Sequence, residues 1–165
     1  MLELCITNLG KYNEGFLIYE RLELPYTEEE LKKVLDKIGI NEEYEEWFIS
    51  DYETELDIKI SEYENLEKLN DNISELMDLN EDIEVINGII GELGDDLEVV
   101  ISTLSGGNYS ILNGITSYFD LGFTLAEEIY NIDTSSYINT FLDYSSLGEQ
   151  SDYCLIGGDM AISIY

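Results

Sequence analysis

The sequence contains no histidine, and this absence removes several kinds of chemistry. Histidine is the side chain that most often serves as a general base and as a metal ligand near neutral pH. Nucleophiles activated by a Ser–His or Cys–His pair are excluded, because each of them needs an imidazole. The two cysteines, Cys5 and Cys154, form no C-x-x-C pair and therefore indicate neither a zinc site nor a dithiol redox motif.

Positive charge is scarce. Seven Lys and Arg residues stand against 37 Asp and Glu, which gives a formal net charge of −30. All seven cations lie in the first 68 residues, and 18 of the acids follow Lys68. An ordinary soluble surface mixes both signs, whereas this excess of one sign repels itself and opposes compaction. We therefore expect the charge to have a use, although a solubility device or a high-salt adaptation remains an alternative that composition leaves open.

Long apolar runs and a basic N-terminal segment are also missing. No run approaches the roughly 18 residues that cross a bilayer, and residues 1–3 do not resemble the start of a secretion signal. We expect a cytoplasmic protein without a membrane anchor. Direct binding of nucleic acid through the protein's own charge is excluded, because both partners would be polyanions.

The chain nevertheless has the material for a folded core. Hydrophobic residues make up 44% of it, too many for a disordered acidic tail. The acids are interleaved with Ile, Leu, Val and Tyr, so they should be held on folded elements. The 13 tyrosines fit two interpretations. Their rings pack in the core with hydroxyls at its rim, or they join the acids on a surface presented to a partner.

Local patterns predict an α+β first domain over residues 1–61. Apolar alternation predicts strands at residues 2–9, 16–24 and 46–53, with a glycine-bounded loop at residues 10–15. Thr27 and Glu30 form a capping-box pattern, which predicts the start of a helix that Gly39 ends. This domain is expected to be a small antiparallel sheet with one helix.

The rest of the chain predicts two further parts. In residues 62–105 the apolar residues follow helical spacing, which predicts a central bundle of short helices. Residues 106–165 predict a small sheet with short helices, namely a strand at 109–112, helices at 121–130 and 137–147, and a terminal hairpin. The expected fold class is therefore α+β in three parts, 1–61, 62–105 and 106–165.

The sequence contains no motif with the residue spacing that metal binding, phosphate binding or catalysis would require. Asp78, Asn80, Asp82 and Glu84 alternate like calcium-loop ligands. However, Ile83 and Ile89 stand where an EF-hand needs Gly and Glu. No dinucleotide or Walker-type phosphate loop is present. We expect no cofactor, no metal and no enzymatic activity. A divalent-metal hydrolase built from clustered carboxylates remains the alternative from the enzyme class.

Three segments carry a family resemblance. They are residues 8–15 (NLGKYNEG), residues 41–46 (NEEYEE) followed by 49–53 (ISDYE), and residues 137–142 followed by Asp143, Tyr144 and Gly148. Together with the length, the charge and the order of elements, they resemble the ArdA-type antirestriction proteins over nearly the whole chain.

The resemblance implies an elongated protein that dimerises through its C-terminal part. It also implies carboxylates that imitate the phosphates of bent B-form DNA. The implied partner is the DNA-binding groove of a type I restriction–modification enzyme, chiefly its methyltransferase core, which the protein would occupy competitively. The alternative is an acidic mimic directed at another DNA-binding protein, such as a nucleoid protein or a repressor.

The residues expected to carry this mimicry are solvent-facing acids of the middle and C-terminal parts. They are Asp71, Glu75, Asp78, Glu81, Asp82, Glu84, Glu92, Asp95, Asp96, Glu98, Glu127, Glu128, Asp143, Glu149 and Asp152. For the dimer, the C-terminal hairpin is expected to offer an edge strand that pairs with its symmetry mate. Ile162, Ile164 and Tyr165 are the residues expected at that interface.

Overall fold

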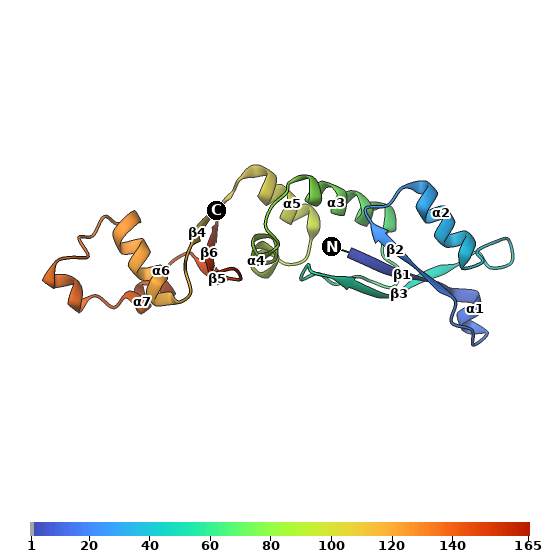
Figure 1. The fold of residues 1–165 in the computed structure, drawn as a ribbon, viewed down its shortest axis with the longest axis horizontal. Coiled ribbons are helices and arrows are strands. Elements are labelled where there is room, and N and C mark those ends of the chain that lie inside the picture. The colour runs from blue at the N-terminus through green and yellow to red at the C-terminus, as the bar shows by residue number, and fades with distance from the viewer. Residues whose placement is uncertain (1) are drawn as a thin grey trace. The chain divides into compact units, whose positions relative to one another are not determined.

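The computed structural model describes residues 2–165, apart from the side chains of residues 138 and 139. Within them the fold is α+β, with two antiparallel sheets of three strands each, which confirms the expected class. The chain divides into two compact units, Met1–Glu81 (unit 1) and Asp82–Tyr165 (unit 2) (Figure 1). The finer division into three parts stays a prediction.

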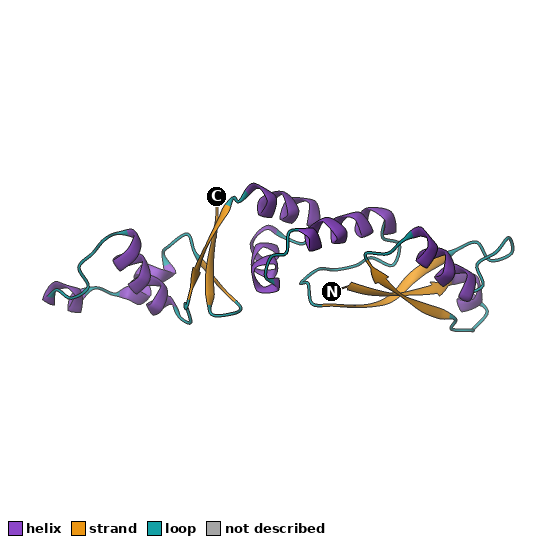
Figure 2. Ribbon diagram, turned by 45° about the horizontal axis from the view of Figure 1, so that its top comes forward, coloured by secondary structure: helices purple, strands orange, loops and turns teal. Residues whose placement is uncertain are grey.

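Unit 1 is a three-stranded sheet covered by helices. Its elements are β1 (Leu2–Asn8), α1 (Leu9–Asn13), β2 (Tyr19–Leu24), α2 (Glu28–Lys37), β3 (Trp47–Thr54) and α3 (Leu66–Asp78). The strand order is β2-β1-β3, and β1 is antiparallel to both neighbours. In both ribbon views α2 and α3 lie on the same side of this sheet (Figures 1 and 2). The alternate residues Leu2, Leu4 and Ile6 are buried in the core.

The segment at residues 10–15, expected as a loop, contains the short helix α1. The reason lies in Asn8, which is fully buried. Its side-chain amide donates to the carbonyl of Ile38 at 3.0 Å, and its side-chain oxygen accepts from the N–H of Lys11 at 2.9 Å. Asn8 thus caps α1 from a position that the core fixes. The left-handed turn comes later, at Gly15 (φ 90°).

Local signals for α2 and α3 are confirmed. Thr27 accepts from the N–H of Glu30 at 3.3 Å, and the Glu30 carboxylate accepts from the N–H of Thr27 at 2.8 Å. This is the reciprocal capping box. Gly39 follows α2 with a φ of 78°, a conformation in which glycine is not strained. On α3 the residues Leu69, Ile73 and Leu76 form a buried stripe at helical spacing.

Unit 2 combines helices with the second sheet. Its elements are α4 (Ile83–Leu93), α5 (Leu97–Gly106), β4 (Tyr109–Asn113), α6 (Tyr118–Thr124), the π-helix η1 (Leu125–Ile129), the 3-10 helix η2 (Tyr137–Phe141), α7 (Tyr144–Glu149), β5 (Cys154–Ile156) and β6 (Met160–Ile164). The helix expected at residues 137–147 is interrupted, because the Asp143 side chain accepts from the N–H of Ser146 and begins α7. The predicted terminal hairpin is confirmed as β5–β6.

The expectation that the last strand is an edge strand is wrong. The order of the second sheet is β4-β6-β5, so β6 is its middle strand. Ile162 pairs with Ile111 of β4 on one side and with Cys154 of β5 on the other, and it is 1% exposed. The hairpin was predictable because its strands are adjacent in sequence. The pairing with β4 joins residues about 50 positions apart and leaves no local signal.

Two glycines bring α6 and α7 into close contact. A Cβ added at Gly122 would overlap the carbonyl oxygen of Tyr144, and one added at Gly148 would overlap the carbonyl oxygen of Tyr118. The two helices therefore touch backbone to backbone. Beside them Leu121 and Leu125 are buried, in one cluster with Ile115 and Ala161.

Candidate protein-binding surface

One face of α3 carries a row of carboxylates. Asp71, Glu75 and Asp78 recur at intervals of four and three residues, which places them on one side of the helix. All three are exposed, whereas the opposite side holds the buried stripe. Glu67 is also exposed and lies one turn before Asp71, so it extends the row. Sequence reasoning omitted Glu67, although its spacing of four residues from Asp71 was a usable signal.

The acids of α4 are held against the β5–β6 hairpin. Glu84, Gly88 and Glu92 follow one another at intervals of four and so share a helix face. A Cβ at Gly88 would lie 2.7 Å from the Cγ2 atom of Ile156, which shows that α4 lies directly on β5. The pKa of the Cys154 thiol is raised, chiefly by a hydrogen bond with Glu92 and secondly by burial of the thiol. Glu92 therefore lies next to the sheet.

Two of the expected acids also cap helices with their side chains. Asp96 accepts from the N–H of Glu98 at 3.1 Å at the start of α5. Asp143 accepts from the N–H of Ser146 at 3.1 Å and from its hydroxyl at 2.8 Å. These hydrogen bonds lower the pKa of Asp143, so its carboxylate stays ionised at neutral pH. A carboxylate at a helix N-terminus is also favoured by the helix dipole.

Fourteen of the fifteen expected acids are exposed, and Glu81 is half-buried. The first four, Asp71 to Glu81, belong to unit 1, and the other eleven belong to unit 2. The structure groups Asp71, Glu75 and Asp78 on α3 and, separately, Glu84 and Glu92 on α4. Glu81 follows α3 in unit 1, and the other nine are distributed over loops, helix ends and η1 of unit 2.

Several of the positive side chains pair with acids of unit 1. Lys11 pairs with Glu14 at 2.9 Å, Lys33 with Glu29 at 3.2 Å, and Lys37 with Glu20 at 3.2 Å. Unit 2 has 14 acids and no cation in its sequence, so side-chain ion pairing cannot neutralise it from within. Its surface therefore keeps its negative charge.

A second carboxylate row crosses the first sheet and was missed by the sequence reasoning. Glu3 lies directly opposite Glu23 on β2 and opposite Glu53 on β3. Arg21 pairs with Glu3 and, at 3.6 Å, with Glu53, which offsets part of this repulsion. Only the strand register brings these three acids side by side, because they are distant in the sequence.

These arrangements are suited to binding a partner. Throughout residues 2–165, no group of three or more His, Cys, Asp or Glu side chains is placed to hold a metal ion. No helix in the described part of the chain is both long and apolar enough to span a membrane. Exposed carboxylates on fixed elements favour a partner with a positively charged surface.

Residues 4–159 match the family described as antirestriction protein (ArdA). The chain belongs to the ArdA family. No curated protein matches the chain. Membership of the ArdA family implies antirestriction activity and interaction with restriction enzymes, and the proteins of this family are inhibitors rather than enzymes.

Two of the segments that carry the ArdA resemblance meet in the structure. A Cβ at Gly10 would lie 2.5 Å from the Cδ1 atom of Tyr44, so glycine allows the Tyr44 ring to rest on α1. The Tyr44 hydroxyl donates to Glu14 at 2.8 Å and accepts from Lys11 at 2.6 Å. The first two motifs, residues 8–15 and 41–46, therefore pack against each other in unit 1.

Proposed function

We propose that this chain inhibits type I restriction–modification enzymes by imitating bent B-form DNA with its surface carboxylates. It occupies the DNA-binding groove of the methyltransferase core, and DNA is excluded from that groove while the inhibitor is bound. The observation that carries the proposal is the carboxylate row on α3, which stands opposite a buried apolar stripe and is fixed by it.

Charge density supports this mechanism. Duplex DNA carries one negative charge per about 1.7 Å of its axis, so 30 net charges correspond to about 50 Å of duplex. The acids on α3 recur every three to four residues, an axial spacing of about 5 Å. A groove shaped for phosphates is already positively charged where such a row would lie. Because helices and strands hold the acids, binding costs little extra ordering of the inhibitor.

Occlusion needs no chemical step. The inhibitor and DNA compete for the same positive groove. The affinity of each for the groove falls as salt is added, because salt screens the charges and weakens the driving force from counterion release. The binding energy is spread over many carboxylates. A single Asp→Asn change should weaken binding by no more than about fivefold, the upper range for one exposed charge pair.

The direct experiment is competition between this protein and DNA for a purified type I methyltransferase at low and high salt. The first variant neutralises the α3 row with Glu67→Gln, Asp71→Asn, Glu75→Gln and Asp78→Asn. Its affinity should fall by on the order of a hundredfold, and its dependence on salt should be shallower.

The matched control removes four charges from four separate places outside both carboxylate rows, with Asp36→Asn, Asp51→Asn, Asp133→Asn and Asp159→Asn. A smaller loss in this variant supports an ordered row, whereas an equal loss would mean that only net charge matters. Binding that does not change with salt would refute the mimicry. Capture of an unrelated DNA-binding protein in place of the methyltransferase would redirect the proposal to another target.

The proposal includes a homodimer formed through the C-terminal sheet. Since β6 is the middle strand, buried Ile162 is not available for edge pairing. The outer strands are β4 and β5, and α4 lies directly on β5. Pairing of β4 with its symmetry mate is the geometry that this sheet favours. Ile164 is half-buried, and Tyr165 is 76% exposed at the end of the sheet.

Sedimentation equilibrium tests the dimer. Tyr165→Glu places a charge beside the Tyr109 carbonyl, to which the Tyr165 hydroxyl now donates at 3.2 Å. If the interface includes this end of the sheet, the variant should sediment as a monomer. A dimer that persists in the variant would reject Tyr165 as an interface residue.

A further inference from the structure

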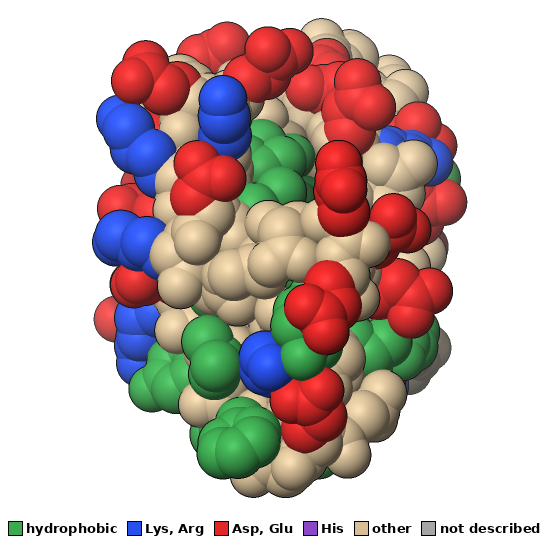
Figure 3. Space-filling view, turned by 90° about the vertical axis from the view of Figure 1, so that its right-hand side faces the viewer, with side chains coloured by type: hydrophobic (Ala, Val, Ile, Leu, Met, Phe, Trp, Pro, Cys, Tyr) green, Lys and Arg blue, Asp and Glu red, His purple; other side chains and the backbone are tan. Residues whose placement is uncertain are grey.

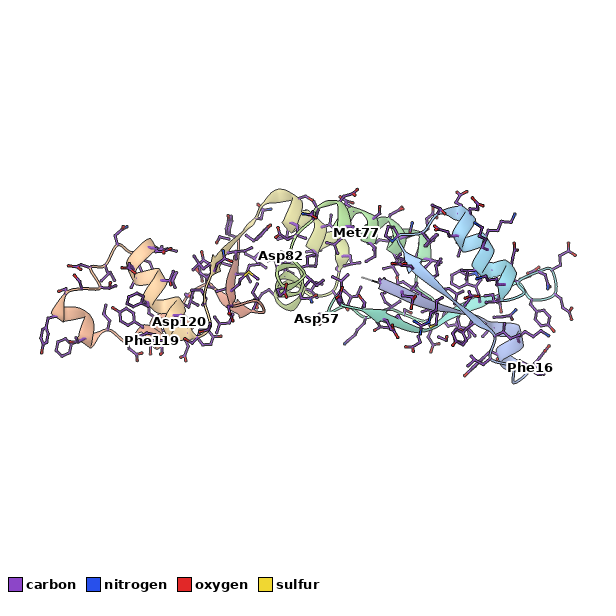
Figure 4. The ribbon with its side chains drawn as sticks, in the orientation of Figure 1. Phe16, Asp57, Met77, Asp82, Phe119 and Asp120 are labelled. Carbon is purple, nitrogen blue, oxygen red and sulfur yellow. The ribbon has the colours of Figure 1, made fainter. Side chains whose placement is uncertain are left out.

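The tip of unit 1 exposes a patch of large apolar side chains on a very acidic molecule. The patch, called here the apolar tip, consists of Tyr12, Phe16, Leu17, Ile18 and Tyr19. Phe16 is 60% exposed and Leu17 is 64% exposed. Figure 4 shows Phe16 beside α1 at the end of unit 1, and the end-on view in Figure 3 shows hydrophobic side chains gathered there. Contiguous exposed apolar side chains usually mark an interaction site.

The backbone of the apolar tip is fixed. The N–H of Phe16 donates to the Lys11 carbonyl at 2.9 Å, and the N–H of Asn8 donates to the Ile18 carbonyl at 3.1 Å. The Tyr12 ring packs edge-on against Phe48, with ring centroids 5.3 Å apart. These contacts fix the Tyr12 ring and the backbone that carries the other exposed side chains before any partner arrives, which reduces the entropy lost on binding.

A rim of carboxylates is attached to the apolar tip. Tyr44 connects it through its hydrogen bonds to Lys11 and Glu14, and Leu9 donates its N–H to the Glu46 carbonyl at 3.0 Å. The segment around Tyr44 adds four exposed glutamates: Glu42, Glu43, Glu45 and Glu46. The pKa of Glu14 is lowered, chiefly by the hydrogen bond from the Lys11 ammonium and secondly by the one from the Tyr44 hydroxyl. Glu14 is therefore ionised at neutral pH.

We infer that the apolar tip is a hydrophobic anchor that enters the same restriction enzyme whose DNA-binding surface the carboxylates occupy. This inference rests on the proposed function. An apolar centre with a charged rim is the usual anatomy of a protein–protein interface, and the buried aromatic and aliphatic side chains supply most of its energy. The rim determines the charge of the partner, because four glutamates and Glu14 favour a basic surface around the apolar pocket.

The same rim disfavours other occupants. In a second copy of this chain facing the patch, the two glutamate rims would lie opposite each other and repel. Cytoplasmic lipid surfaces are anionic and would repel the rim in the same way.

The apolar tip would give the inhibitor an advantage that DNA lacks. A charge row alone competes with DNA on equal terms, and salt weakens both. Burial of Phe16 and Leu17 depends little on ionic strength, since the hydrophobic effect follows the apolar area removed from water. The anchor therefore adds affinity that a polyanion of the same charge would not have.

The test uses the full chain with the substitutions Phe16→Ser and Leu17→Ser together. Binding to a purified type I methyltransferase is measured at several salt concentrations by titration calorimetry. We expect the double variant to lose about tenfold or more in affinity, as for a hot-spot residue. The slope of log affinity against log salt should match the wild type, because no charge has changed. The control is Tyr63→Ser, which removes another exposed aromatic side chain of unit 1 (68% exposed).

Each result decides the inference. A double variant that binds as tightly as the Tyr63→Ser control overturns the anchor and leaves the charge mimicry intact. If the wild type does not bind the methyltransferase at all, the proposed function fails, and the anchor fails with it. A change in sedimentation mass of the double variant would assign the apolar tip to self-association and overturn the inference.

Discussion

At the scale of single residues, two glycines determine how closely the helices of unit 2 can approach. Gly122 and Gly148 place the backbones of α6 and α7 in direct contact, and each faces a carbonyl oxygen of the other helix. No flexible side chain lies between them to absorb a shift. Gly91 offers a contrast, because a Cβ at this exposed position in α4 would meet nothing within 4 Å.

Gly122→Ala should therefore lower the free energy of unfolding by about 3 kcal/mol or more, since an added methyl group must push the two backbones apart. Gly91→Ala should raise it by about 0.5–1 kcal/mol, because alanine is the better helix former. Urea denaturation followed by circular dichroism checks both values. Equal tolerance of the two substitutions would mean that α6 and α7 do not touch as described.

Two carboxylates at helix N-termini predict a dependence of stability on pH. Hydrogen bonds from Thr116 and Ser117 lower the pKa of Asp120, and those from Ser146 lower the pKa of Asp143. A pKa lowered by folding adds stability above the unfolded-state value of about 3.9, and this stability is lost as the pH falls through the folded-state pKa.

The double variant Asp120→Asn, Asp143→Asn should thus be less stable than the wild type at pH 7. The difference should shrink steadily below about pH 4. Urea midpoints of the wild type and the variant, measured from pH 7 to pH 2, give this difference directly. The other acids titrate in both proteins, so their contribution cancels in the difference. A difference that stays constant over this range would show that Asp120 and Asp143 do not stabilise the fold through their charge.

At the scale of elements, strand order changes the role of the C-terminal segment. β6 was expected to be an edge for dimer pairing, but it joins β4 to β5. Its residues Ala161 and Ile162 are buried in unit 2. The segment is therefore needed for the sheet itself before it can serve any interface.

Removal of residues 160–165 should unfold the second sheet rather than release a folded monomer, because β4 and β5 lose their common partner. Removal of Tyr165 alone should leave the sheet intact, since this residue is 76% exposed and follows the end of β6. Amide chemical-shift dispersion in NMR spectra distinguishes an intact second sheet from an unfolded one. A folded monomer after the longer deletion would show that the sheet does not require β6.

At the scale of the whole molecule, the charge acts in opposite directions on folding and on binding. The net charge of −30 repels itself in the folded state, and salt screens that repulsion. The proposed complex, in contrast, is held by attraction between opposite charges, which salt also screens.

The melting temperature should rise by about 2–5 °C between 10 mM and 500 mM NaCl, while affinity for the methyltransferase falls over the same range. Differential scanning fluorimetry and the competition assay measure the two quantities on one sample. A sucrose series at matched osmolality controls for general solute effects. A melting temperature that falls with salt would contradict self-repulsion as the main electrostatic cost.

The amino-acid sequence by itself determined the features that depend on composition or on neighbours along the chain. The absence of histidine and the excess of acid restricted the function, and local patterns predicted the Thr27 capping box, the α3 stripe and the terminal hairpin. Exposure of the acids on α3 also followed, because charged residues opposite an apolar stripe must face water. Each of these signals is a property of the composition or lies within a few residues of sequence.

Only the tertiary structure decided what depends on contacts between distant residues. Asn8 begins α1 because Ile38, thirty positions later, fixes its side chain. The row formed by Glu3, Glu23 and Glu53 exists because three strands align in one register. β6 is central because β4 pairs with it from far upstream. Such contacts form when the chain packs, and no local pattern of residues specifies which distant partner will be chosen.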